Sequence, residues 1–516
     1  MRKHKNLLTL LVVSTLLASG CESRPERDST SSAQGSAGLE QESTGLQQDF
    51  KDPPRKYGPM PFWFLNGELT TEGIREQMEA AHKSGFTGVA PLPTARKSDE
   101  RPGTTPLFLT PDFFDRLQDI IDMAEELDME VILYDDNDYP SGMAGGKLGE
   151  SYPQHTMKRL DIVETEFTGP GTFSQAFDAI ELMAAVAMHT ETKERIEISE
   201  FAGDGVLSWE APEGTWSIML FPLVKDGWHT PFPVVDYLDP VAVKTKMQFT
   251  YERYAEKFGS HFGNRIQKIY FDDVGFWKFP RSWTARFNQK FEELYGYDPK
   301  PYYPALWHDI GPETESIRNA FFNTRAEMLA ESYPKLVAQW TEEHGLQSTG
   351  HPPGNYDPTP VDMNGDIFKF YRYTQMPLAD AILNYQFGQD GHKLISSAAD
   401  YYDRPLVAVE IYGAFRKRDV HFDDAMLYRP MFEMFARGTN FVIPHAMWYN
   451  PENRIIEPLI SSGNEAIADE LPAYSKFVAR ACLLLQGGRR VSEIGVLYPI
   501  EDLSGFYNFG KPEKVR

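Results

Sequence analysis

The sequence has only two cysteines, Cys21 and Cys482, among its 516 residues. If Cys21 is taken up by export processing, no disulfide can form within the mature chain. The sequence is also short of positive charge. Its formal net charge is −24 at pH 7, and no local basic stripe would offset the repulsion of a polyanion. We therefore expect no nucleic-acid partner.

Several familiar motifs are missing as well. There is no zinc-ligand spacing, no P-loop, no GxGxxG after an apolar strand and no GxSxG. What the chain does have is aromatic residues, with 25 Tyr, 34 Phe and 9 Trp. Such a content indicates either a large core or faces that stack on sugar rings, and composition alone does not separate the two.

The N-terminus has the layout of an export signal. Arg2, Lys3 and Lys5 precede an apolar run at residues 7–17, and small residues then lead to Cys21. The layout resembles a bacterial lipoprotein signal, in which Cys21 would carry lipid after cleavage. The run is shorter than the roughly 20 residues of a membrane-spanning helix. We expect a chain exported and lipid-anchored to the cell envelope at Cys21, with an ordinary secretory peptide as the alternative.

The chain after the signal divides into a linker and a long α/β region. Residues 22–50 are polar and read as a flexible linker. Apolar strands are expected at 61–66, 86–92 and 129–134, and helices between them begin at Thr70 and Thr110. Strands that alternate with helices predict a parallel sheet. Later strands are expected at 268–273, 347–351, 381–385, 406–412 and 440–448.

This order predicts a (β/α)8 TIM-like barrel over residues 51–490. Short apolar segments between about 160 and 235 predict an antiparallel β insertion after the third strand. One helix is expected to run from Pro240 to Phe258. The apolar run at 494–498 is expected to be a strand, so that residues 491–516 would begin a second, truncated α/β domain.

The stretch KIYFDDVGF at 268–276 is the main candidate for chemistry. An apolar strand runs straight into Asp272 and Asp273, and Glu410 lies within the apolar strand VAVEIY. Carboxylates at the ends of barrel strands are the groups that cleave glycosidic bonds. Because side chains alternate along a strand, only one Asp of the pair should face the barrel mouth, and the other should support it. A turn or capping pair, or for Glu410 a structural salt bridge, is the competing explanation.

Other polar and aromatic residues fall at predicted strand ends and are candidates for substrate binding. Each one alone is more often structural, but the shared position at the carboxyl ends favours a site. They are Trp63, Asn66, Asp135, Asp136, His351, His445 and Trp448, with Asp272 as support. The oxygen-rich loop with Asp135, Asp136 and Asp138 could also hold Ca²⁺, although its spacing is not that of an EF-hand. No metal ligand is assigned.

Eight motifs in order resemble glycoside hydrolase family 106, the bacterial α-L-rhamnosidases. They are PFWFLNGELT, ILYDDNDYPSGMAGGK, VDYLDP, YFDDVGF, RYTQMPLAD, VAVEIYGAF, NFVIPHAMWY and LLLQGGRRVSEIGVLYP. The resemblance implies an inverting barrel enzyme, with calcium in the site of some members. By position, Glu410 would be the general base and Asp273 the general acid. Relatives generally read Asp-Glu-Pro where this chain has Asp272-Asp273-Val274, so the acid here is one methylene shorter.

Three functions follow from these observations. The first is an exported, inverting hydrolase that removes a terminal sugar such as α-L-rhamnose from a polysaccharide or oligosaccharide and needs no cofactor for the chemistry. The second is a retaining glycosidase on the same barrel, which differs in the separation of its carboxyl groups. The third is a glycan-binding lipoprotein derived from such an enzyme and without activity.

Overall fold

The computed structural model describes residues 45–96, 98, 103–226, 231–355, 361–382, 391–413 and 422–510. The chain divides into two compact units, residues 1–52 and 53–516. In the first unit, residues 45–51 are helical. The expected linker is thus wrong at its end, because Leu46 and the glutamines after it are good helix formers.

In the described part of the second unit, nine strands form one parallel sheet, in the order β15-β14-β13-β12-β10-β3-β2-β1-β16. Each strand pairs in parallel with its neighbours. The strands are β1 (Phe62–Leu65), β2 (Gly88–Pro93), β3 (Glu130–Tyr134), β10 (Ile266–Phe271), β12 (Gln347–Gly350), β13 (Met376–Ala381), β14 (Ala408–Ile411), β15 (Phe441–Pro444) and β16 (Met447–Trp448).

The sheet curls, because its two edge strands, β15 and β16, are adjacent in the sequence. β15 pairs with β14 and β16 pairs with β1, yet only His445 and Ala446 separate β15 from β16. Alternate side chains from both halves of the sheet form one buried cluster, which includes Phe62, Tyr270 and Ala408. We call this side the inner face. The side chains between them pack on the other face, against the helices.

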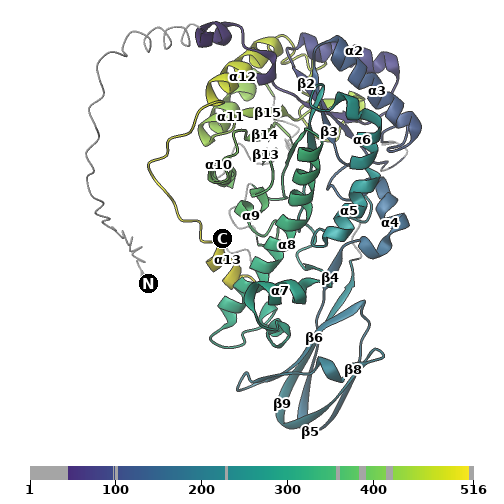
Figure 1. Cartoon of the computed structure of the whole chain (residues 1–516), viewed down its shortest axis with the longest axis vertical. Helices are drawn as coiled ribbons and strands as arrows, with labels where there is room; N and C mark the ends of the chain where they lie inside the picture. The colour runs from purple at the N-terminus through teal and green to yellow at the C-terminus, as the bar shows by residue number, and fades with distance from the viewer. Residues whose placement is uncertain are drawn as a thin grey trace, which may run out of the picture. The chain divides into compact units, whose positions relative to one another are not determined.

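The helices that connect the strands begin where the sequence predicts. The hydroxyl of Thr70 accepts the N–H of Gly73, and that of Thr110 accepts the N–H of Phe113, so both predicted N-caps are confirmed. Figure 1 labels most of the helices. They are α2 (Thr71–Lys83), α3 (Pro111–Glu126), α4 (Lys147–Ser151), α5 (Pro240–Phe249), α6 (Tyr251–Phe258), α7 (Phe287–Tyr295), α8 (Thr314–Glu343), α9 (Ile367–Tyr371), α10 (Gly391–Tyr401), α11 (Asp424–Arg437), α12 (Leu471–Leu485) and α13 (Ile500–Phe506).

The predicted antiparallel insertion is present between β3 and α5. Its long strands β5, β6 and β9 lie side by side in Figure 1, and β9 pairs with both of the others. The remaining short strands pair at the margins of this sheet. The strands of the insertion are β4 (Lys158–Leu160), β5 (Val163–Ala176), β6 (Glu181–His189), β7 (Arg195–Glu197), β8 (Ala202–Gly203) and β9 (Val206–Lys225). A later strand, β11 (Ser282–Trp283), follows β10 in the chain and joins this sheet by pairing with β4.

Three element predictions are wrong. The strand expected at 381–385 begins where β13 ends, at Ala381, and residues 383–385 lie outside the described residues. The helix expected from Pro240 to Phe258 is two helices that break at Thr250. Residues 491–499 form no strand, and Val496 and Leu497 are 89% and 88% exposed. An apolar run becomes a strand only where a neighbouring strand pairs with it. The second-domain boundary stays a prediction.

Among the described residues, no helix combines the length and the apolar character that a membrane crossing requires.

Candidate functional site

A buried histidine, His351, lies among carboxylates at the carboxyl ends of three strands. Its Nε2 atom is 3.0 Å from Oδ1 of Asp272 and 3.3 Å from Oε2 of Glu410. Its Nδ1 atom is 3.7 Å from Oδ1 of Asp273. His445 joins from the other side, with Nε2 3.7 Å from Oε1 of Glu410. The structure therefore brings five of the predicted site residues together.

Two buried tyrosines hold the carboxylates from the inner face. The hydroxyl of Tyr270 donates to Oε2 of Glu410 at 2.8 Å, and that of Tyr134 donates to Oδ2 of Asp272 at 2.8 Å. The two rings are stacked, with centroids 5.7 Å apart. Burial raises the pKa of both phenols far above the ordinary value, so both remain donors at any pH of interest. Glu410 and Asp272 are thus fixed in orientation.

The expectation that only one Asp of the pair faces the mouth is wrong. Tyr270 is on the inner face, so strict alternation would place Asp272 inside and Asp273 outside. However, β10 ends at Phe271, and Asp273 has a φ of 49°, which is left-handed backbone. Alternation therefore no longer applies, and both carboxyl groups reach His351. A left-handed non-glycine residue is strained, and such residues cluster at functional sites.

The residues of the cluster differ in the direction and cause of their pKa shifts. Burial raises the pKa of Glu410 to about 7, although the contact with His351 lowers it. Burial, and then the charge of Asp272, raise the pKa of Asp273 well above its ordinary value. Burial alone would lower the pKa of His351, but Asp272 and Glu410 more than offset this and raise it. Burial lowers the pKa of His445 to about 4, so its imidazole is neutral at pH 7.

Asp380 is a site residue that the sequence analysis missed, although it lies in the RYTQMPLAD motif. It is the register partner of Glu410 across β13 and β14 and is 5% exposed. Together with Asp273 and His351 it offers side-chain atoms within 4.8 Å of one another. A correct strand at 376–381 would have placed Asp380 on the inner face with Leu378, since the two are two residues apart.

Asp135 and Asp136 serve the protein itself. Both are fully buried. Asp135 pairs with Lys246 Nζ at 2.8 Å and accepts the hydroxyls of Tyr251 and Tyr333. Asp136 accepts five backbone N–H groups of the loop that follows β3, from Asn137, Gly142, Met143, Ala144 and Gly145. Asp135 therefore binds side chains of α5, α6 and α8, Asp136 binds the loop, and both are buried away from the substrate contact that was predicted.

Trp63 lies on the outer face and does not reach the site. Its indole is fully buried, and Nε1 donates to Oε1 of Gln77 in α2 at 2.8 Å. Its neighbours Phe62 and Phe64 belong to the inner face, so Trp63 must point outward. The predicted substrate contact is wrong because sequence alternation does not tell which set of residues faces inward.

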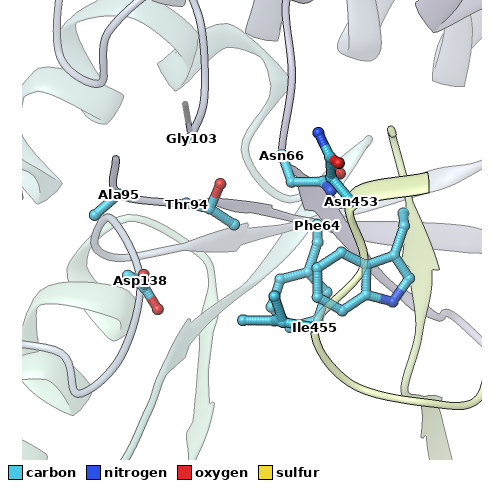
Figure 2. A pocket seen from close by; sticks show the side chains of 9 residues that line it. Phe64, Asn66, Thr94, Ala95, Gly103, Asp138, Asn453 and Ile455 are labelled. Carbon is cyan, nitrogen blue, oxygen red and sulfur yellow. The ribbon is translucent and has the colours of Figure 1, made fainter. Parts of the chain in front are cut away.

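Asn66 and Trp448 line a pocket at the carboxyl ends of β1, β2, β3 and β16 (Figure 2). The Trp448 ring stacks on Phe64 with centroids 4.1 Å apart, and Phe64 is 5.1 Å from the ring of His445. Asn66 is held by two hydrogen bonds of 2.8 Å with the backbone of Asn450. The pocket therefore adjoins the carboxylate cluster through Phe64 and His445.

Two sets of described side chains have atoms close enough to hold a metal ion. One is Asp272, His351 and Glu410, and the other is Asp273, His351 and Asp380. Both depend on the imidazole of His351, whereas calcium prefers about six to eight oxygen ligands. The loop after β3 does not fit calcium either, because Lys246 and backbone N–H groups already bind Asp135 and Asp136. Calcium thus fits these described residues poorly. Cys21, the predicted lipid site, lies outside the described residues.

A curled parallel sheet with buried carboxylates at its carboxyl end defines a protein of the glycosidase-barrel class. Within that class, a family model described as alpha-L-rhamnosidase matches residues 172–509. The chain belongs to this family, glycoside hydrolase family 106, which confirms the resemblance drawn from the motifs.

The chain is also similar to solved structures and to a curated protein. A rhamnosidase from Novosphingobium sp. PP1Y has a TM-score of 0.65 at 16% identity, over 86% of this chain and 61% of that one. A beta-galactosidase from Halorubrum lacusprofundi has a TM-score of 0.45 at 13% identity, over 83% and 57%. A Formosa agariphila protein provisionally named beta-glucuronidase is 24% identical over 325 residues, 59% of this chain and 27% of that protein. The chain spans less than two thirds of each of these proteins.

Proposed function

We propose that the protein is an exported, inverting glycoside hydrolase that removes a terminal sugar, α-L-rhamnose in the first instance, with Asp273 as general acid and Glu410 as general base. The observation that carries the proposal is the buried cluster in which His351 contacts Asp272, Asp273 and Glu410. Family membership supports the reaction class. We place this site in a closed (β/α)8 barrel, with β15 and β16 as two halves of the eighth strand.

The pKa shifts suit one displacement step. Glu410 takes a proton from water as the water oxygen bonds to the anomeric carbon, while the bond to the glycosidic oxygen breaks and that oxygen takes the proton of Asp273. Burial and the charge of Asp272 raise the pKa of Asp273, which favours the protonated form that a general acid needs. The donor Tyr270 and the imidazole of His351 hold Glu410 in one orientation. Both groups then exchange protons with solvent.

Asp272 is less suited than Asp273 to be the acid. Asp272, His351 and Glu410 have side-chain atoms within 4.8 Å of one another, whereas inverting enzymes separate their carboxyl groups by about 6.5–9.5 Å. Such closeness favours the second candidate, a retaining glycosidase that uses Asp272 and Glu410, since retaining pairs lie about 5–5.5 Å apart. Nε2 of His351 contacts both of these carboxylates, and its Nδ1 lies near Asp273, so the contacts of His351 do not choose between the two pairs.

The stereochemistry of the product decides between these readings. The protein is incubated with a panel of aryl glycosides and pectic oligosaccharides, and the anomer first released is identified by proton NMR. Inversion supports the Asp273–Glu410 pair, and retention supports the Asp272–Glu410 pair. Binding without release would instead support the glycan-binding protein without activity, for which the short Asp273 is the argument, since a misplacement of about 1 Å can cost on the order of 10²-fold in rate.

Variants test the residues directly. Asp273→Asn and Glu410→Gln should each lower kcat at least about 10²-fold, which is the usual size of a general acid or base contribution. Asp115→Asn is the matched control, because Asp115 is exposed on α3. Sugar release that survives both site substitutions would overturn the assignment. The same assay with chelator tests calcium, since a loss that calcium restores would support the calcium expectation.

A further inference from the structure

A groove lies between the antiparallel insertion and the start of α8, outside the candidate site. Its volume is about 450 Å³, within the roughly 300–1,000 Å³ of small-molecule sites. One wall consists of residues 192–195, where the chain turns from β6 into β7, and the other consists of residues 301–302 and 310–313. Every residue of this lining is described. The groove is therefore large enough for a ligand, and its charges can be compared directly.

Arg195 joins the two walls of the groove. Its Nη1 atom donates to the carbonyl oxygen of Ile310 at 2.8 Å, and its Nη2 atom donates to Oε1 of Glu313 at 2.6 Å. The guanidinium group lies 5.3 Å from the centroid of the Tyr302 ring. The Arg195 side chain is 12% exposed, whereas that of Glu313 is 42% exposed. The walls are thus fixed to each other, and Glu313 still presents its carboxylate to solvent.

Lys193 occupies a position of the turn that favours glycine. Its φ is 63°, which is left-handed backbone, and strained residues of this kind cluster at functional sites. The charge of Lys193 acts across the groove. The pKa of Asp309 is lowered by the N–H of Gly311 and the hydroxyl of Thr314, and also by Lys193. In the described part of the chain, the Lys193 ammonium has no ion-pair partner, so it is available to a ligand.

The charges of the lining favour a neutral ligand with many hydroxyl groups. The lining has two cations and two carboxylates, those of Lys193, Arg195, Glu194 and Glu313. A hydroxyl group accepts from an ammonium group and donates to a carboxylate, so it can pair with both kinds of side chain. A polyanion would meet the two carboxylates unfavourably. Tyr302 and Ile310 add apolar surface for the C–H groups of a sugar ring.

α8 places the groove on the side of the parallel sheet where the candidate site opens. The hydroxyl of Tyr333 in α8 donates to Asp135, which directly follows β3, so Tyr333 marks the level of the carboxyl ends. After Tyr333, α8 leads back to the amino end of β12. About 20 residues, or on the order of 30 Å at 1.5 Å per helical residue, separate Tyr333 from Glu313. A single sugar is too short to reach both sites, whereas a polymer is not.

We propose that this groove is an accessory site that binds a neutral polysaccharide chain at a distance from the carboxylate cluster. Lys193 and Glu313 bind hydroxyl groups of the chain, and the apolar surface contacts its rings. The inference rests on the proposed function, because it makes the polymer the substrate whose terminal sugar is removed. A chain held at the groove has a higher effective concentration at the cluster, which lowers KM without altering the chemical step.

Binding to polymers is measured on the whole protein by electrophoresis in native gels that contain a soluble polysaccharide. The neutral probes are galactan, arabinan and xylan, and polygalacturonate is the acidic probe. At least one neutral polymer should retard the protein, and more strongly than polygalacturonate does. Absence of retardation by all three neutral polymers, or stronger retardation by polygalacturonate, would overturn the proposal.

Lys193→Gly tests whether the groove is where the polymer binds. Glycine suits the left-handed backbone, so the melting temperature should be retained or rise. Binding should weaken about 3- to 10-fold, which is what one hydrogen bond contributes. Asp204→Gly is the matched control, because Asp204 is exposed, has a φ of 51° and lies in another turn of the insertion. Binding that is the same in Lys193→Gly as in the wild-type protein would contradict the proposal.

Kinetics separate the accessory site from the catalytic one. On a polymer that the protein binds and cleaves, Lys193→Gly should raise KM about 3- to 10-fold and leave kcat unchanged, while hydrolysis of aryl glycosides stays as in the wild-type protein. An equal loss on aryl glycosides would contradict an accessory role. Polymer binding that depends on Lys193, without hydrolysis of any glycoside, would contradict the proposed function alone.

Discussion

At the scale of single residues, the protonation states of Glu410 and Asp273 control the proposed reaction. Glu410 must be deprotonated to act as base, so kcat/KM should fall about tenfold per unit as the pH drops below about 7. Asp273 must be protonated, and its raised pKa should move the alkaline limb of the profile above the range of an ordinary carboxyl group. A pH profile on an aryl glycoside checks this, and an acid limb near pH 4.5 would contradict the burial of Glu410.

Asp380 offers an independent check on that profile. Its charge is among the causes that raise the pKa of both Asp273 and Glu410. Asp380→Asn keeps an oxygen for the N–H of Ile382 but removes the charge. Both limbs of the profile should therefore move to lower pH. A profile that stays in place while the rate falls would mean that Asp380 only shapes the site.

Glu410 should also cost stability. Its pKa is raised from 4.5 in the unfolded chain to about 7 in the folded one, so the folded state binds more protons between these values. The contribution of the protonated Glu410 to the free energy of unfolding is then fully present below pH 4.5 and is lost as the pH rises through 7. At about 1.36 kcal/mol per unit, Glu410→Gln should raise the free energy of unfolding at pH 8 by up to about 3 kcal/mol and change it little at pH 4.5.

Urea unfolding at the two pH values measures this difference, with Asp115→Asn as the exposed control. An equal effect of Glu410→Gln at both pH values would show that charge is not its source.

At the scale of elements, the loop after β3 depends on a buried ion pair. Lys246 of α5 lies 2.8 Å from Asp135 and 3.7 Å from Asp136, with all three side chains fully buried. Removing one partner of such a pair leaves an uncompensated charge, which costs about 3–5 kcal/mol. Lys246→Met should lower the free energy of unfolding by that amount. Lys244→Met, an exposed position on the same helix, should change it by less than about 0.5 kcal/mol in urea unfolding.

Elements with local signals were predictable from the sequence, and those set by distant contacts were not. Thr70 and Thr110 cap their helices as expected, because capping needs only a side chain and an N–H three residues on. β13 was placed five residues late, since MPLADA has a proline and no β-branched residue to mark it. That error hid Asp380. Whether Trp63 points inward or outward depends on how the whole sheet curls. The direction of Asp273 depends on its own left-handed backbone, which the sequence does not show.

At the scale of the whole molecule, the charge of the chain agrees with the charge of its site. The net charge is −24, and four of the carboxyl groups counted in it, those of Asp272, Asp273, Asp380 and Glu410, gather in the candidate site at the end of the sheet. Approach of a polyanionic polymer would be unfavourable, and more so at low ionic strength. The long-range field therefore favours a neutral sugar over a polyanionic one.

Lipidation of Cys21 would determine where the molecule acts. If Cys21 is lipidated after export, the whole protein should partition with membranes and take up a labelled fatty acid when expressed in a bacterium that processes such signals. One lipid chain gives marginal membrane binding, so stable anchoring implies more than one acyl chain or a second contact.

Cys21→Ser should abolish both the label and the partition. Cys482→Ser is the matched control, because Cys482 is buried in α12 and is the only other cysteine in the sequence. A labelled Cys21→Ser variant, or an unlabelled wild-type protein cleaved near that residue, would favour the ordinary secretory peptide and release the enzyme from the envelope.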